Sequence, residues 1–180
     1  LSGNEMTDKI YHKITDHYNH SYDRARWEIF TYIHNDEGWI EGVYTGMMYN
    51  IGYDQLPNNQ VMNVEHTWPK SSMLDDDELQ GSKSDMHHLF PTQSRANSLR
   101  SSLHFGHPVD VTHEVYADAS EPDVISGSRK GKDSLGRLIF EVRPEHKGDT
   151  ARALFYYTVR YQRYIPTYEE KILRCWHAMD

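Results

Sequence analysis

Cysteine is nearly absent from this 180-residue chain, which contains one, Cys175. A single cysteine excludes an internal disulfide, but it does not identify the redox compartment in which the protein works. Cys175 lies near the C-terminus in a segment with helical periodicity. We expect its thiol to be buried as a small hydrophobic side chain.

Long apolar runs are also missing. No stretch approaches the roughly 18 residues that a membrane-spanning helix requires, so we expect no membrane partner. The chain begins at Leu1 rather than Met and has no signal-peptide pattern. We interpret it as a mature or trimmed form.

Basic residues are in short supply, with 19 Lys and Arg against 27 Asp and Glu and a formal net charge of −8. Nucleic-acid binding normally uses an excess of positive charge, so this balance argues against tight binding of a polyanion. The deficit is uneven, because residues 81–164 carry 12 basic and 10 acidic groups. This second half is the expected phosphate-facing side, with metal ions screening the substrate.

The length suits one domain over residues 1–180, and no repeat or linker divides the chain. Apolar spacing and capping residues predict the secondary structure. Helices are expected at residues 5–18, 24–34 (N-cap Asp23), 92–103 (N-cap Thr92), 149–164 and 167–176 (N-cap Thr167, with Glu170 completing a capping box). Strands are expected at 61–66 and 138–142, a solvated loop at Asp75–Glu78 and a long surface excursion at 105–135.

Side chains suited to catalysis concentrate in two segments, Asn63–Pro69 and Ser84–Arg100. Phosphodiester hydrolysis needs a base that activates water, a cation that neutralises developing charge, and a group that holds the phosphate in line. Histidine is the natural base near neutral pH because its ordinary pKa is about 6.5. His66 is the candidate for this role.

Oxygen-bearing side chains in the same segments suit a hard cation. Mg²⁺ prefers oxygen ligands and keeps several waters, so one or two protein oxygens suffice. Glu65 and the side-chain oxygen of Asn97 are the candidate ligands. Arg100 follows Asn97 by three residues, which places both on one side of a helix, where a guanidinium can hold a phosphate oxygen.

One geometric condition limits this interpretation. Adjacent residues on a regular strand point to opposite faces, so Glu65 and His66 serve one site only if the strand ends or is distorted there. Trp68-Pro69 directly afterwards favours a strand end, because proline cannot donate to a ladder. Each of these residues, taken alone, is more often structural than catalytic. The hypothesis of a catalytic site therefore depends on the order of these residues along the chain and on their occurrence together.

The combined pattern resembles the bacterial endonuclease I family, whose members are ββα-metal (His-Me finger) nucleases. The resemblance runs from about residue 44 to 164, and its motifs are specific only when taken together. The matching stretches are Tyr44-Thr45-Gly46, Asn63–Ser71, Lys83–Arg100 with Phe105-Gly106 after it, and Phe140–Tyr161. The chain departs from many relatives in lacking cysteines that could pair.

The resemblance implies an α+β fold, a helix-rich single domain around a central ββα-metal motif at approximately residues 61–103. Its core would be strands at 61–66 and 84–88 packed on the helix at 92–103. His66 matches the general base, and Glu65 and Asn97 match the ligands of a single Mg²⁺, which Mn²⁺ or Ca²⁺ can replace. The remaining matches are Arg100 as a catalytic phosphate contact, Asp85, His87 and His88 as supporting residues, and Arg152 as a phosphate contact or a salt bridge that pins the C-terminal helix.

The resemblance therefore implies a secreted or periplasmic endonuclease that cuts DNA, and RNA as well, without sequence preference and leaves 5′-phosphate ends. Its partner would be the nucleic-acid backbone, and no protein partner is expected. Two alternatives stay open. One is a zinc-dependent hydrolase with His66, His87 and His88 as ligands, since three neutral imidazoles make an open zinc site. The other is a nucleic-acid binding module without catalytic activity.

Overall fold

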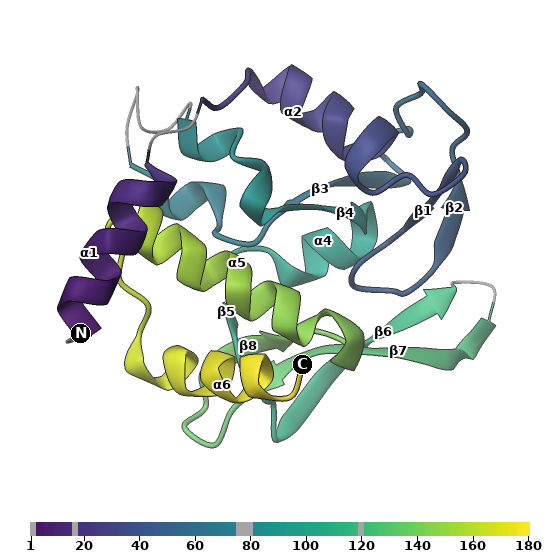
Figure 1. Cartoon of the computed structure of the whole chain (residues 1–180). Coiled ribbons are helices and arrows are strands. Elements are labelled where there is room, and N and C mark those ends of the chain that lie inside the picture. Colours follow the sequence, from purple (N-terminus) through teal and green to yellow (C-terminus); the bar gives the residue numbers. More distant parts are fainter. Residues whose placement is uncertain (1–2, 16–17, 75–80, 119–120) are drawn as a thin grey trace.

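The computed structural model describes residues 3–15, 18–74, 81–118 and 121–180. These residues form a mixed α+β structure, which confirms the α+β part of the predicted fold class, whereas the ββα-metal motif stays a prediction (Figure 1). The acidic run Asp75–Glu78 lies outside the described residues. No helix in the described ranges is long and apolar enough to cross a membrane. The single-domain interpretation stays a prediction.

Helices occur at both ends of the chain and in its middle. The α-helices are α1 (Gly3–Ile14), α2 (Tyr22–Glu28), α4 (Ser94–Arg100), α5 (Lys147–Arg160) and α6 (Thr167–Ala178). A π-helical turn, η1 (Ile29–Ile33), continues α2, so the helix predicted at 24–34 is confirmed in extent. Short 3-10 helices are η2 (Lys70–Ser72), η3 (Met86–His88) and η4 (Pro144–His146).

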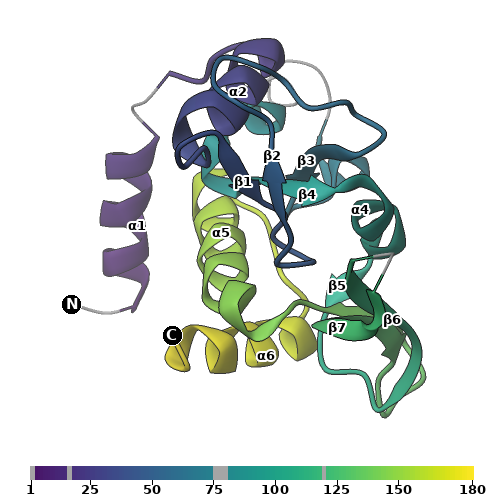
Figure 2. The same ribbon diagram turned by 90° about the vertical axis from the view of Figure 1, so that its right-hand side faces the viewer.

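The strands form three small sheets among the described residues. In the first, β1 (Trp39–Glu41) pairs with β2 (Met48–Asn50), and in the second, β3 (Met62–His66) pairs with β4 (Leu89–Gln93). The third has the order β5-β8-β7-β6, with β5 (His104–Phe105), β6 (Asp110–Asp118), β7 (Glu121–Lys132) and β8 (Leu138–Glu141). Figure 2 shows β3 and β4 above this sheet, with α4 between them.

The two-stranded element β3–β4 is antiparallel and continues directly into α4. The expected strand at 61–66 is confirmed, but the expected partner at 84–88 is wrong, because Met86–His88 is a 3-10 helix and the partner strand begins at Leu89. The Asp85 side chain accepts a hydrogen bond from the His87 amide and so caps this turn. A capped turn withdraws these amides from strand pairing.

Helix α4 is shorter than predicted and has a different N-cap. Thr92 lies in β4, and Gln93 caps the helix by accepting from the amide of Ala96. The helix ends at Arg100 because Ser101 adopts a φ of +53°, outside the right-handed helical region. The chain therefore turns sharply after Arg100.

The segment predicted as a long surface excursion, 105–135, contributes the paired strands β6 and β7 to the third sheet, and the sequence did not predict these strands. Its glycines and serines serve close packing as well as turns. A side chain at Gly131 would place a Cβ 2.2 Å from the carbonyl oxygen of Asp110 on the neighbouring strand. Only glycine allows this approach of β6 to β7.

Three smaller expectations are corrected by the structure. Cys175 is exposed rather than buried. Ser21 caps α2 in place of Asp23, by accepting from the amide of Arg24. Thr167 is the first residue of α6 and makes no capping bond, because Pro166 occupies the N-cap position.

Two hydrophobic clusters meet at the β3–β4 element. One is built on α2, η1, β1, β3 and β4 and includes Phe30, Met62 and Leu89. The other joins α4, α5, α6 and the third sheet, and Phe90 of β4 packs against it. Neighbouring residues of β4 therefore face different clusters, which fixes the register of this strand.

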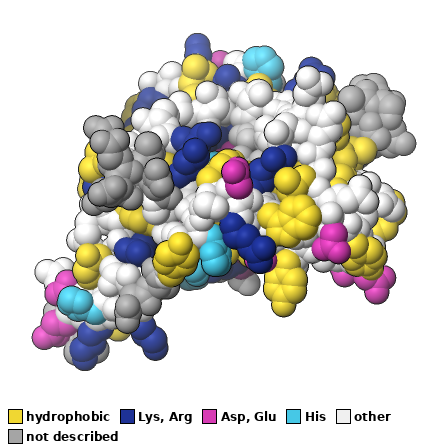
Figure 3. All heavy atoms as spheres, turned by 90° about the horizontal axis from the view of Figure 1, so that it is seen from above, with side chains coloured by type: hydrophobic (Ala, Val, Ile, Leu, Met, Phe, Trp, Pro, Cys, Tyr) yellow, Lys and Arg dark blue, Asp and Glu magenta, His cyan; other side chains and the backbone are white. Residues whose placement is uncertain are grey.

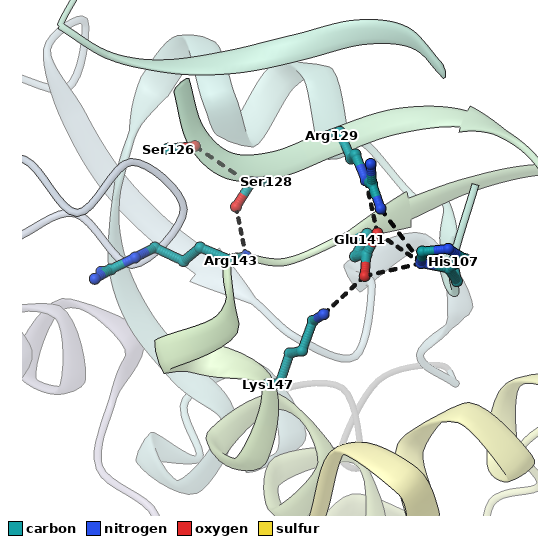
Figure 4. A network of polar contacts seen from close by, with 7 residues as sticks. All are labelled: His107, Ser126, Ser128, Arg129, Glu141, Arg143 and Lys147. Atoms are coloured by element: carbon teal, nitrogen blue, oxygen red, sulfur yellow. Dashed lines mark hydrogen bonds and ion pairs between the residues drawn. The ribbon is translucent and has the colours of Figure 1, made fainter. Parts of the chain in front are cut away.

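A buried carboxylate ties the third sheet to α5. Glu141 of β8 accepts from Arg129 Nε and Lys147 Nζ, each at 2.7 Å, and lies 3.1 Å from His107 Nδ1. Figure 4 shows these three side chains converging on Glu141 from β7, from the start of α5 and from the loop after β5. The cationic partners hold the pKa of Glu141 below its ordinary value despite burial.

We predict that Glu141→Gln lowers the free energy of unfolding by about 2 kcal/mol, because it leaves partly buried cations without their counter-ion. The loss stays below that for a fully buried pair, since Arg129 reaches solvent. Urea unfolding measures it. The matched control is Glu145→Gln, whose side chain is 63% exposed and which should change stability by less than about 0.5 kcal/mol. Equal losses in both variants would contradict the structural role of Glu141.

Acidification should also destabilise the fold through buried histidines. Burial lowers the pKa of His34 and of His88 to about 4. The unfolded chain binds a proton near pH 6.5, so the stability that neutral His34 contributes is present above that pH and is lost as pH falls toward 4. Between pH 7.5 and 5 this loss amounts to roughly 1–2 kcal/mol for His34.

The measurement is urea unfolding of wild type and His34→Gln at pH 7.5, 6 and 5. The variant should lose less stability on acidification than wild type, and His177→Gln, which alters an exposed histidine of α6, should match wild type. Other groups titrate in this range, so the prediction concerns the difference between the curves. Parallel curves for His34→Gln and wild type would contradict it.

Candidate active site

A cleft of about 640 Å³ opens between α2, the end of β3 and α4. Its walls include Tyr22 and Arg26 from α2, Lys70 from η2, and the predicted site residues. On the face that Figure 3 shows from above, Lys and Arg side chains gather around the middle next to hydrophobic ones. The predicted site residues that border this cleft are Glu65, His66, Asn97 and Arg100.

The end of β3 brings Glu65 and His66 to one site, which is the condition that a shared catalytic role imposes on two adjacent residues. His66 is the last residue of the strand, opposite Leu89, and Glu65 stands opposite Phe90. Both side chains border the cleft although both are almost completely buried. The expectation of a strand end at this position is confirmed.

Two ring contacts and one hydrogen bond hold His66. Its Nε2 lies 2.9 Å from the carbonyl oxygen of Lys83. Since a carbonyl only accepts, Nε2 carries the hydrogen in the neutral ring and Nδ1 is left as the acceptor. The ring stacks on Tyr22 at 5.6 Å and meets His88 edge-on at 5.7 Å. Burial, and then the neighbouring His88, lower the pKa of His66 to about 3, so the ring is neutral at pH 7.

Glu65 is oriented by two partners that both engage Oε1. The Tyr44 hydroxyl donates to it at 2.8 Å, and Arg100 Nη1 lies 3.1 Å away. Burial raises the pKa of Glu65, while Arg100 and the Tyr44 hydrogen bond oppose that rise. No contact among the described residues occupies Oε2. One carboxylate oxygen is therefore held by the protein and the other remains for a ligand.

Asn97 is oriented in the same way. Its Nδ2 donates to Asn63 Oδ1 at 2.7 Å and to the carbonyl oxygen of Val64 at 3.3 Å. Both amide hydrogens are thus used, and within the described ranges Oδ1 has no partner. A carboxylate oxygen from Glu65 and an amide oxygen from Asn97 form a donor set that suits a hard divalent cation. The residues present therefore fit the Mg²⁺ that the sequence predicts.

Arg100 is occupied by the protein itself. It is 2% exposed, and besides Glu65 it donates to the carbonyl oxygens of His66 and Ser101 through Nη1 and of Thr67 through Nη2. These bonds fasten the end of α4 to the end of β3. A contact between Arg100 and a substrate phosphate stays a prediction, whereas the support it gives to Glu65 is part of the structure.

The predicted supporting residues fall into two groups. His88 lies against His66 and is held by the carbonyl oxygen of Ser82 at 2.7 Å. Asp85 is buried and accepts from the amide and ring of His87 and from two tyrosine hydroxyls, Tyr156 and Tyr161. The His87 ring stacks on Tyr156 instead of bordering the cleft.

Arg152 lies away from the cleft. It pairs with Asp149 at 2.6 Å and with Asp180 at the C-terminus. Of the two roles open from the sequence, the structure contains the salt bridge that pins the C-terminal segment. Arg152 is not among the residues that line the cleft.

Sequence reasoning missed several residues of the cleft. Tyr44 was singled out only within a familial tripeptide, and its bond to Glu65 could not be foreseen because 20 residues of sequence separate the two. Arg26, held by Asn59 at 2.6 Å, and Lys70 supply positive charge at the rim. The only sequence signal for Lys70 was its place just after Pro69 in the catalytic segment.

The three-histidine zinc alternative is not supported. Among the described residues, no group of three or more His, Cys, Asp or Glu side chains is arranged to hold a metal ion. His66 and His88 are in contact, but His87 turns toward Asp85 and Tyr156. A site that uses Glu65 and Asn97 needs only two protein ligands and is unaffected by this finding.

The cleft brings together a histidine that can accept a proton and two side-chain oxygens suited to a cation, a combination that suits hydrolysis. A model of the endonuclease I family matches residues 2–178, and the chain belongs to this family of nucleases. It is also similar to the extracellular ribonucleases of Bacillus subtilis (strain 168) and Bacillus amyloliquefaciens, with 37% and 35% identity over 100 residues. Each alignment covers 56% of this chain and 29% of the relative.

We predict that the buried Glu65–Arg100 pair is strongly coupled. Arg100→Met should lower the free energy of unfolding by roughly 3 kcal/mol, because it leaves a buried carboxylate without its cation. Adding Glu65→Gln should recover at least about 1.5 kcal/mol of that loss. Urea unfolding of the single and double variants in EDTA measures this coupling energy.

The exposed pair Arg174–Glu170 is the matched control, because it lies one helical turn apart on the surface of α6. Its coupling energy should stay below about 1 kcal/mol. A Glu65–Arg100 coupling no larger than that of this surface pair would show that the buried contact does not organise the site.

Proposed function

We propose that this protein is a metal-dependent endonuclease that hydrolyses phosphodiester bonds of DNA and RNA without sequence preference. The observation that carries the proposal is shared by Glu65, His66 and Asn97. In each side chain, hydrogen bonds within the protein engage one polar atom and leave the other without a partner among the described residues. The atoms left are Oε2 of Glu65, Nδ1 of His66 and Oδ1 of Asn97. A module that only binds phosphate does not need a proton-accepting nitrogen beside two oxygen atoms available to a cation.

In the proposed reaction, Nδ1 of His66 accepts a proton from a water molecule, and the resulting hydroxide attacks phosphorus. The bond from phosphorus to the 3′ oxygen breaks, and the departing 3′ oxygen takes up a proton from solvent water, which leaves a 5′-phosphate and a 3′-hydroxyl end. The polarity follows from the family resemblance. The Nε2 bond to Lys83 fixes the tautomer in which Nδ1 can act as base.

Glu65 and Asn97 would hold one Mg²⁺, for which Mn²⁺ or Ca²⁺ can substitute. A divalent cation at this place supplies neutralisation of the negative charge on the phosphate and the leaving oxygen. Tyr44 and Arg100 both contact Oε1 of Glu65 and so fix the orientation of the carboxylate. Oε2 is thereby left available for the cation. The order of β3, β4 and α4 supports assigning them as a ββα-metal (His-Me finger) motif.

The proposed substrate is the nucleic-acid backbone. Arg26 and Lys70 at the rim supply cations for phosphate, and contacts to phosphate carry no sequence information. The similar Bacillus proteins are named ribonucleases, which supports RNA as a substrate beside DNA. Their description as extracellular supports the proposal that this protein is secreted or periplasmic.

The test is incubation of the purified protein with supercoiled plasmid and, separately, with RNA in Mg²⁺, Mn²⁺ and EDTA. We expect both polymers to be degraded in Mg²⁺ or Mn²⁺ and to survive in EDTA. His66→Ala should lower kcat by roughly 10²–10⁴-fold, because it removes the base. Glu65→Gln and Asn97→Ala should raise the Mg²⁺ concentration needed for half-maximal activity.

The matched control is His177→Ala, which removes an exposed histidine of α6 and should leave activity unchanged. If wild type binds both polymers but cleaves neither in any metal, the protein is a binding module and the proposal is wrong. Full activity in His66→Ala would assign the base elsewhere.

A further inference from the structure

A second hollow lies between α4 and β6, and its lining residues are on the side of the helix away from the catalytic cleft. Its volume is about 470 Å³, within the range of small-ligand sites. Ala96 and Val115 are buried and Leu99 is half-buried, so these residues form an apolar floor. The rest of the groove is polar or aromatic and comprises Gln93, Arg95, Ser98, Thr112, His113, Glu114 and Tyr116.

Helix α4 is the wall shared by this groove and the cleft. Arg95, Ser98 and Leu99 face the groove, whereas Asn97 and Arg100 border the cleft. An α-helix with its side chains is about 10 Å across. A strand held at Asn97 has to pass around α4, so it reaches the groove several nucleotides farther along.

The groove rim has the chemistry that single-stranded nucleic acid uses. Arg95 is exposed, and in the part of the chain that the structure describes no hydrogen bond or ion pair engages its guanidinium. Tyr116 is 44% exposed, and His113, which also lines the groove, is exposed too. Aromatic faces stack unpaired bases without regard to sequence, and a free guanidinium binds phosphate. Glu114 and Gln93 can accept hydrogen bonds from the amino groups of a base.

We propose that this groove binds an unpaired nucleotide of the substrate strand, a few positions from the bond that is cut. Arg95 contacts the phosphate and Tyr116 stacks on the base, over the floor made by Ala96 and Leu99. The inference rests on the proposed nuclease function and adds a substrate class to it, since a base inside a duplex has to unpair and unstack, at a cost in free energy, before it can enter the groove. Single strands are therefore bound more tightly than duplexes of the same sequence.

The experiment measures binding apart from cleavage. A fluorescein-labelled 12-nucleotide single strand and the 12-base-pair duplex of the same sequence are titrated with the His66→Ala protein in EDTA, and fluorescence anisotropy gives the Kd. Arg95→Ala or Tyr116→Ala in this background should weaken single-strand binding about tenfold and leave duplex binding unchanged. Tyr116→Phe should restore the affinity, because it retains the ring. Arg95→Ala should also reduce the slope of log Kd against log salt by about 0.7.

The matched controls are Lys171→Ala and Tyr32→Ala, which remove an exposed cation of α6 and an exposed ring of η1. Neither should change the single-strand Kd. Unchanged single-strand binding in the groove variants, or an equal loss on single strand and duplex, would overturn the proposal. Absence of cleavage by wild type in Mg²⁺ would refute the nuclease function instead, and the groove would still be judged by these Kd values.

Discussion

The buried ion pair between Glu65 and Arg100 is the contact on which the rest of the site depends. It joins the last turn of α4 to the end of β3, and both side chains are almost fully removed from water. A charge in such a place is costly unless a partner compensates it, so each of the two residues requires the other. The Tyr44 hydroxyl completes the set by donating to the same carboxylate oxygen.

This pairing determines how the cleft is organised. Arg100 also donates to the carbonyl oxygens of His66 and Thr67, at the point where β3 ends and its alternation of faces stops. The strand end that lets adjacent residues serve one site is thus held by the cation that orients Glu65. Side chains held by such supporting contacts lose little further conformational entropy when a substrate binds, which is the usual basis of a preorganised site.

That Glu65, His66 and Asn97 would lie together was easier to predict from the sequence than the fold around them, and the three residues do border one cleft. Their chemistry and order are local features of two short segments, whereas their catalytic roles stay a prediction. The strand expected at 84–88 failed because a single side chain, Asp85, caps a turn there. The strands β6 and β7 were missed because their glycines and serines resemble loop composition, although Gly131 is required by strand packing. The roles of Tyr44 and Arg100 depend on long-range contacts that no periodicity encodes.

The charge distribution along the chain did not indicate which cations line the cleft. Residues 81–164 carry the excess of basic groups, yet Arg26 and Lys70, which line the cleft, come from the acidic first part of the chain. At physiological ionic strength charges act over about 8 Å, so a bound phosphate responds to the cleft rather than to the net charge of −8. The cleft is lined by three cations and two carboxylates, and Glu65 is already compensated by Arg100. A weakly positive cleft on an acidic body therefore remains compatible with a polyanionic substrate, and a divalent cation at Glu65 and Asn97 would strengthen that local field further.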